Sequence, residues 1–261
     1  MELTWVSIII LICSGIIVGF INTLAGGGTV VSLCVFIMLF GLPPLVANGT
    51  NRVAILFQNM TAVAFFQKKK LIDWRKVLHL GIPIILGSLT GALIAVSISN
   101  KLFHNIFAVV VMLFGISMLM NPNRYIYEKP ELINRKIKGW QYLLFFFLGV
   151  YGGFVHVGIG YILLAVLVLI NGYDLLKANI LKNVLVLLYI PFSLSIYALQ
   201  GNVCWTFGLV HAIGNVIGAG LAARLAIKKG ASFIRYIVLI LIGIVILQLF
   251  GVITPQTHFL R

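Results

Sequence analysis

Residues 24–53 read LAGGGTVVSLCVFIMLFGLPPLVANGTNRV: a glycine run, an apolar stretch and a further glycine that leads into a polar segment. A shift of 131 residues lays this stretch on the second half of the chain, where GGFVHVGIG (152–160) and KANILKNV (177–184) follow the same pattern. Hydrophobic segments broken at matching places in two halves are typical of membrane transporters. The shift pairs identical residues without a gap: Gly27/Gly158, Gly41/Gly172, Ala47/Ala178, Asn48/Asn179, Val53/Val184, Trp74/Trp205 and Gly87/Gly218.

The composition places the chain in a membrane. Hydrophobic residues make up 61% of the sequence and charged residues 9%, with a mean hydropathy of +1.13. The runs 77–98, 102–120 and 234–253 approach or exceed the length of about 18 apolar residues that cross a bilayer as a helix. We therefore expect an all-α polytopic protein of the cell (inner) membrane, whose partner is the lipid bilayer.

The net charge of +14 does not by itself indicate nucleic-acid binding. Most Lys and Arg residues fall in short connections, where they orient a membrane chain and meet anionic headgroups. The three cysteines, Cys13, Cys34 and Cys204, lack metal-ligand spacing. We expect no metal, no cofactor and no nucleic-acid partner. The sequence is compatible with a homo-oligomer.

Loop charge predicts that the two halves are inserted with opposite orientation. The loop 67–76 holds five Lys and Arg residues, whereas its counterpart 199–205 carries no charge. Near 99–104 only Lys101 is charged, whereas the counterpart 224–235 carries four cations. Because positive loops lie on the cytoplasmic side, the bias changes sides between the repeats.

This orientation divides the chain into a first membrane repeat (1–120), a cytoplasmic linker (121–140) and a second membrane repeat (141–261). Within each repeat, the segment before the span that contains Arg52 or Lys182 must start and end on the same side of the membrane. We therefore expect two inverted repeats, each with a glycine-broken hairpin followed by three spanning helices. The first arm of the first hairpin is about long enough to span the bilayer by itself.

The turns of the two hairpins, at 24–28 and 152–160, are expected to point toward each other across the membrane. Irregular backbone is tolerated there only inside protein or beside a water-filled cavity, and glycine permits such turns. Glycines elsewhere in the spans are interpreted as close helix contacts. These are Gly87, Gly91, Gly218 and Gly220.

Arg52 and Lys182 are the sharpest candidates for a functional site. Each lies about two helical turns into its span, which places it ~10–13 Å deep in a core of about 30 Å. A cation at that depth needs compensation, and all five acidic residues lie at ends or in loops. A bound anion could supply the negative charge. Snorkelling of the long side chains toward the headgroups is the alternative.

Polar neighbours favour a site for an oxyanion around the two cations and the glycine turns, because amides and hydroxyls can donate to its oxygens. Gln58 and Asn59 continue the polar face of the Arg52 segment. The predicted substrate-binding residues are Arg52, Lys182, Asn48, Thr50, Asn51, Asn179, Asn183, Gly26, Gly27, Gly28 and His156.

Two histidines lie within apolar sequence. His156, in the second glycine turn, either binds substrate or carries a proton, or is a hydrogen-bonded structural residue. His211 and Asn215 lie one turn apart on a later span and are expected to make a hydrogen bond between helices.

At LAGGG and GLPPLVANGTNRV the first half resembles the sulfite exporter TauE/SafE family of membrane permeases. GVYGGFVHVGIGYILL and LLKANILKNV resemble its second repeat, so the likeness covers essentially the whole chain. The resemblance implies transport of small sulfur-containing anions, such as sulfite, thiosulfate and organosulfonates, in the direction of export. Phe154, Val155 and His156 depart from a plain glycine-rich turn.

The leading hypothesis is therefore a secondary transporter of small sulfur-containing anions. A passive anion channel is the alternative, because no carboxylate is available for a proton relay inside the membrane. An integral membrane enzyme or assembly factor is disfavoured, since the sequence has no paired carboxylates, nucleophile–base motif or His/Cys cluster. We do not expect an enzyme.

Overall fold

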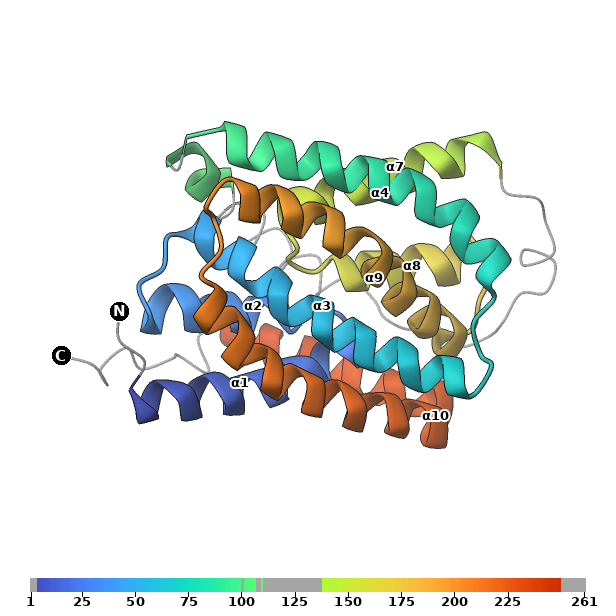
Figure 1. Cartoon of the computed structure of the whole chain (residues 1–261). Helices are drawn as coiled ribbons and strands as arrows, with labels where there is room; N and C mark the ends of the chain where they lie inside the picture. Colours follow the sequence, from blue (N-terminus) through green and yellow to red (C-terminus); the bar gives the residue numbers. More distant parts are fainter. Residues whose placement is uncertain (1–3, 100, 107–108, 110–137, 250–261) are drawn as a thin grey trace.

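All elements described in the structure are helices, as expected. The computed structural model describes residues 4–99, 101–106, 109 and 138–249, and of Arg75 and residues 231–249 it describes the backbone alone (Figure 1). The elements are α1 (Trp5–Leu24), α2 (Thr29–Cys34), the π-helix η1 (Val35–Leu39), α3 (Pro44–Lys68), α4 (Trp74–Ser97), α7 (Gly139–Phe154), α8 (Ile159–Leu169), α9 (Leu175–Leu199) and α10 (Trp205–Leu249).

Four of the described helices are long and apolar enough to cross a membrane, which confirms the polytopic class. They are Trp5–Leu24, Lys76–Ser97, Leu175–Leu199 and Trp205–Gly230. α3 has 25 residues, but its buried polar face makes it less apolar than these four. The predicted span 102–120 and the predicted linker 121–140 lie mostly outside the described residues. α10 is broken at Gly230 (φ +70°, ψ −163°), within the loop expected at 224–235.

Two helical hairpins enter the molecule from opposite ends. In Figure 1, α1 runs inward from the left and α2 with η1 returns there, whereas α7 runs inward from the right and α8 returns to the right. Gly26 (φ +90°) and Gly158 (φ +68°) make the turns in the left-handed region that glycine adopts freely. The turns touch: a Cβ added at Gly26 would meet the backbone of Gly160.

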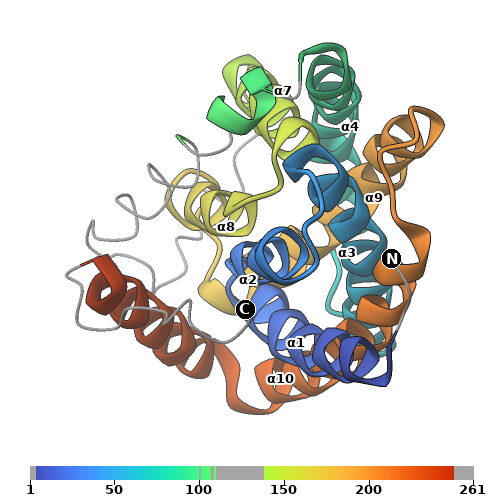
Figure 2. The same cartoon turned by 90° about the vertical axis from the view of Figure 1, so that its left-hand side faces the viewer.

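Each hairpin packs against a helix of the other half. α1 lies along α10 and α7 lies along α4, while α3 and α9 cross between them (Figures 1 and 2). Added methyl groups at Gly87 and Gly91 would meet the backbone of α7, and one at Gly218 would meet that of α1, so these glycines are close helix contacts as predicted. Gly220 differs, because its neighbours are side chains at 3.5 Å or more.

The repeat extends to the bounds of the central helices. α3 and α9 each have 25 residues, and they begin at Pro44 and Leu175, which the shift of 131 superimposes. The same shift pairs the left-handed residues Lys70 and Gly201 just after them. The opposite insertion of the two halves and the division at 1–120, 121–140 and 141–261 stay predictions. The reciprocal packing of the hairpins is what such halves would give.

Candidate functional site

Arg52 caps the inner end of α7. This helix ends inside the protein, so its last carbonyl groups have no partner within the helix. Arg52 Nη1 donates to Gly152 O at 3.1 Å and to Ser193 Oγ at 2.8 Å, and Nη2 donates to Gly153 O at 2.6 Å. The guanidinium also lies 4.5 Å from the centre of the Tyr197 ring. Arg52 has no exposed surface.

Asn48 and Tyr197 complete the same cap. Asn48 Nδ2 donates to Phe154 O at 2.9 Å and to Tyr197 Oη at 2.8 Å, and Tyr197 Oη donates to Phe154 O at 2.8 Å. The carboxyl end of a helix carries partial negative charge, which favours a cation there. The cap therefore supplies part of the compensation that the buried Arg52 requires.

Lys182 caps the inner end of α1 in a corresponding way. Its Nζ donates to Asn22 O at 2.9 Å and to Thr23 O at 3.0 Å, and Asn183 Nδ2 donates to Thr23 O at 3.1 Å. The shift of 131 residues superimposes Arg52 on Asn183, whereas Lys182 falls on Asn51. The two halves thus place the cation at neighbouring positions of the same helix turn.

Neither cation reaches the surface. Lys182 is 2% exposed and points to α1, so snorkelling does not describe it or Arg52. Among the described residues neither makes a salt bridge, since the ion pair found there joins Lys76 and Asp73 at 3.8 Å. Asp73 and Asp174 cap the amino ends of α4 and α9 instead. The two buried charges face helix ends rather than carboxylates.

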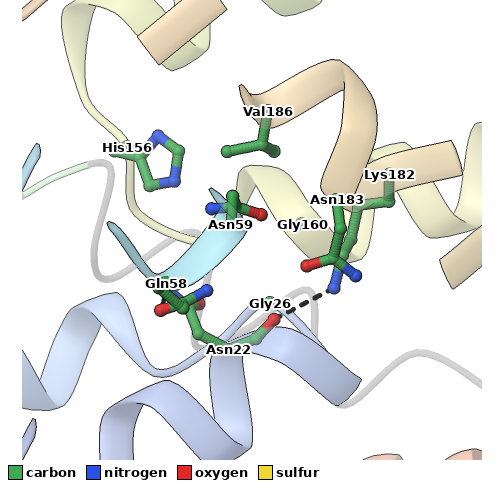
Figure 3. A pocket seen from close by; sticks show the side chains of 9 residues that line it. All are labelled: Asn22, Gly26, Gln58, Asn59, His156, Gly160, Lys182, Asn183 and Val186. Carbon is green, nitrogen blue, oxygen red and sulfur yellow. Dashed lines mark hydrogen bonds between the residues drawn. The ribbon is translucent and has the colours of Figure 1, made fainter. Parts of the chain in front are cut away.

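A small polar cavity lies where the hairpin turns meet (Figure 3). Its volume is about 10 Å³, roughly the room that one water molecule needs. Side chains from both halves form its wall, and Lys182 is the cation among them. The lining residues are Asn22, Gly26, Gln58, Asn59, His156, Gly160, Lys182, Asn183 and Val186.

The cavity wall offers donors and a buried acceptor that has no partner among the described residues. Asn22 Nδ2 makes long hydrogen bonds of 3.4 Å to Thr29 Oγ1 and Gln58 Oε1. Asn183 Oδ1 is buried and has no hydrogen-bond partner among the described residues. The His156 ring contacts Tyr189 Oη through Nδ1 at 2.9 Å and turns Nε2 toward the cavity (Figure 3).

The structure brings four of the predicted site residues to this wall: Lys182, Asn183, Gly26 and His156. Arg52 and Asn48 lie behind it, at the α7 cap. Thr50 Oγ1 accepts a hydrogen bond from Cys204 N at 2.9 Å and so fixes the start of α10.

The other predicted residues support the turns and the helix between them. Asn51 is fully buried, and both polar atoms of its amide lack a partner among the described residues. Asn179 accepts from Asn183 Nδ2 at 3.3 Å. Gly27 lies against the Tyr161 ring and Gly28 against α1. Because Gly27 and Gly28 lack side chains, the turn after α1 can pack closely against α1 itself and against α8.

The comparison with known proteins decides the family. Residues 11–249 match the family described as sulfite exporter TauE/SafE. The chain belongs to this family. A probable membrane transporter protein of Haemophilus influenzae is 29% identical over 232 residues, which cover 89% of this chain and 90% of the relative.

Two further relatives of the TauE/SafE chain carry similar names. The probable membrane transporter protein YfcA of Escherichia coli K12 is 26% identical, over 85% of this chain and 81% of its own length. The probable membrane transporter protein YunE of Bacillus subtilis is 25% identical, over 91% and 96%. No solved structure matches the chain. The TauE/SafE chain is thus a multi-pass protein of the cell membrane from a family of transporters.

Sequence reasoning missed three lining residues of the TauE/SafE chain. Asn22 forms a polar pair with Thr23 in the last turn of the apolar helix α1, and that pair was the available signal. Gly160 ends the glycine turn expected at 152–160, whereas Val186 gave no signal, because it lies in apolar sequence. Gln58 and Asn59 were expected to continue the polar face of α3, and they reach the cavity.

His211 lies outside the cavity and joins helices, as expected. Its Nδ1 lies 2.9 Å from Leu11 O, and its Nε2 lies 3.0 Å from Ser32 Oγ. Asn215 Nδ2 bonds within its own helix to His211 O at 3.0 Å, so only the histidine makes the predicted contact between helices.

Proposed function

We propose that the protein is a secondary transporter that exports small sulfur-containing anions, such as sulfite, thiosulfate or an organosulfonate. One observation carries the proposal: Lys182 lines a small polar cavity at the junction of the two hairpin turns. The membership in the TauE/SafE family supports the substrate class and the direction.

Lys182 is suited to bind an oxyanion. An ammonium group has three donors, and carbonyl oxygens of α1 accept from Nζ at two contacts. The third donor is left for a ligand in the cavity. A hydrogen bond from a charged donor is roughly twice as strong as one between neutral groups, so a sulfur oxyanion gains more here than a neutral molecule.

We assign different roles to the two cations. Lys182, Asn183, His156 and the Gly26 turn contact the ligand, together with the amides of Asn22, Gln58 and Asn59. Arg52 and Asn48 hold the end of α7, which sets the position of the His156 turn. Thr50, Asn51, Asn179, Gly27 and Gly28 shape the surrounding helix contacts.

The small volume of the cavity supports a carrier that changes shape. A sulfur oxyanion is larger than the single water for which there is room, so the wall must open to admit it. Two hairpins from opposite ends, touching at Gly26 and Gly160, are elements that could part on one side at a time. Alternating access around a site between repeats is the usual mode of such folds.

A thermal-shift panel tests the substrate class. Sulfite, thiosulfate, sulfate, taurine and sulfoacetate would each be added to the purified protein, with chloride at equal ionic strength as the reference. A ligand that binds the folded state raises the melting temperature, and we expect this for a sulfur anion. Lys182→Gln should remove the shift, whereas Lys177→Gln, an exposed lysine of the same helix, should keep it.

Uptake of the best anion into sealed proteoliposomes would then establish transport. No shift from any of the five anions, with wild-type protein that is folded, would contradict the proposed substrate class.

A further inference from the structure

His156 has the environment of a proton site within the cavity. Its side chain is 3% exposed, and the ring lies between Tyr189 and the cavity. Nδ1 lies 2.9 Å from Tyr189 Oη, with which it shares a hydrogen bond. Nε2 points into the cavity, toward the place that an anion would occupy (Figure 3).

Positive charge dominates the surroundings of this ring. Lys182 on α9 lines the same cavity, and Arg52 on α3 donates to the carbonyl of Gly152, four residues before His156. The other titratable groups nearby are the phenols of Tyr189, Tyr151 and Tyr161. No carboxylate of the described residues lies among them, so a proton on His156 would be a third positive charge in an empty site.

We propose that His156 binds a proton together with the anion, so that a proton accompanies each anion through the transport cycle. This inference rests on the anion transport proposed above and adds the coupled ion to it. The proton comes from water on the side to which the cavity is open, binds at Nε2, and leaves with the anion on the other side.

The charges of the cavity explain why the two ligands would bind together. In the empty site Lys182 repels a protonated His156, whereas an anion bound beside Lys182 attracts it. The proton and the anion therefore each strengthen the binding of the other by the same factor. A doubly charged anion such as thiosulfate is matched by Lys182 and one imidazolium. Arg52 does not serve this purpose, because it is engaged by the carbonyl groups of α7.

Tyr189 is the positioning residue for the ring. In the tautomer that the proposal requires, its hydroxyl oxygen accepts a hydrogen bond from Nδ1–H, which leaves the lone pair of Nε2 directed at the cavity. Tyr189→Phe should therefore retain proton-linked anion binding but move the pH at which the link is observed, whereas a purely structural contact would change stability alone.

Calorimetry on the purified full-length protein tests the coupling. Thiosulfate and methanesulfonate serve as probes, because neither takes up a proton near neutral pH, whereas sulfite does. Each would be titrated in buffers of equal pH and different ionisation enthalpy, which reveals protons bound with the anion. In the pH range where the anion complex holds the proton and the empty site does not, the Kd for the anion should rise about tenfold for each unit by which the pH increases.

The matched variants are His156→Gln and His104→Gln, the second being an exposed histidine away from the cavity. We expect His156→Gln to bind anion with no proton uptake and no dependence on pH, and His104→Gln to behave as wild type.

The wild-type titration needs no variant, so it decides even if His156→Gln does not fold. Anion binding by wild type without proton uptake, or proton uptake that persists in folded His156→Gln, would overturn the coupling while leaving the proposed function in place. Failure of wild type to bind either probe would count against both proposals.

Discussion

The two buried cations differ in what their removal would leave behind. Arg52 supplies hydrogen bonds to two carbonyl groups and a hydroxyl, all fully buried, and does not line the cavity. Lys182 supplies two bonds to the end of α1 and also faces the ligand space. The same chemistry, a charge at the end of a helix, therefore predicts different phenotypes at the two positions.

Lys182→Gln should weaken anion binding more than it weakens the fold. It removes a charged donor from the cavity while Asn183 still donates to Thr23 O. A charged hydrogen bond contributes roughly 1.5–3 kcal/mol, which is a loss of about tenfold to a hundredfold or more in affinity. The measurement is Kd for thiosulfate beside the melting temperature, with Lys177→Gln as the control. Unchanged affinity in folded protein would remove Lys182 from the site.

Arg52→Gln should show the opposite balance. Its main effect is a lower melting temperature, because each buried carbonyl left without a partner costs about 1–3 kcal/mol. Arg52→Lys should recover only part of that loss, since an ammonium cannot present the planar fork that reaches Gly152 and Gly153 together. A variant with wild-type stability and lost anion binding would instead place Arg52 in direct contact with the ligand.

At the scale of helices, the contact between the two turns is the element on which access depends. Gly26 and Gly160 approach backbone to backbone, and Gly160 has an ordinary helical conformation that any residue can adopt. A side chain at Gly160 therefore changes the approach of the turns without straining its own backbone.

Gly160→Ala should impair transport strongly while leaving most of the protein folded. The added Cβ would meet the Gly26 backbone and push the turns apart. The control is Gly139→Ala at the start of α7, where an added Cβ has no described atom within 4 Å. Transport rates in proteoliposomes, normalised to folded protein, are the measurement. Equal rates for the two variants would make the turn contact a simple connector.

Much of this arrangement of helices was available from the sequence. The matched segments beginning at Pro44 and Leu175, and the glycine runs before them, predict two long polar-faced helices and two turns. The caps could not be predicted. The carbonyl groups that Arg52 and Lys182 bind carry no signature in the sequence, and packing alone brings α7 and α1 to them. For the same reason the sequence did not distinguish Arg52 from Lys182, although Lys182 lines the cavity and Arg52 lies behind it.

At the scale of the whole molecule, the helix directions set which connections share a side. In Figure 1 the α3–α4 connection and the break in α10 lie toward the right, and the α9–α10 connection lies at the left. These two charged connections therefore share one end, and the uncharged loop that contains Gly201 lies at the other.

Cysteine labelling on a background without Cys13, Cys34 and Cys204 tests the assignment of sides. Cysteines at Lys69 and Lys229 should react from the cytoplasm, and one at Gly201 from outside, because all three positions are exposed. Intact cells and inverted vesicles provide the two directions of access. Labelling of positions 69 and 201 from the same side would exclude the inverted insertion of the halves.

The exchange of caps between the halves has a consequence for how the protein is made. Arg52 in the first half meets its partners only when α7 has been synthesised, and the end of α1 receives Lys182 only with α9. A chain that holds only α1 to α4 would therefore lack the partners that Arg52 and the carbonyl groups of Asn22 and Thr23 have in the folded protein. We therefore expect the first half to be unstable when it is produced alone, and to become stable when the second half is supplied to the same membrane.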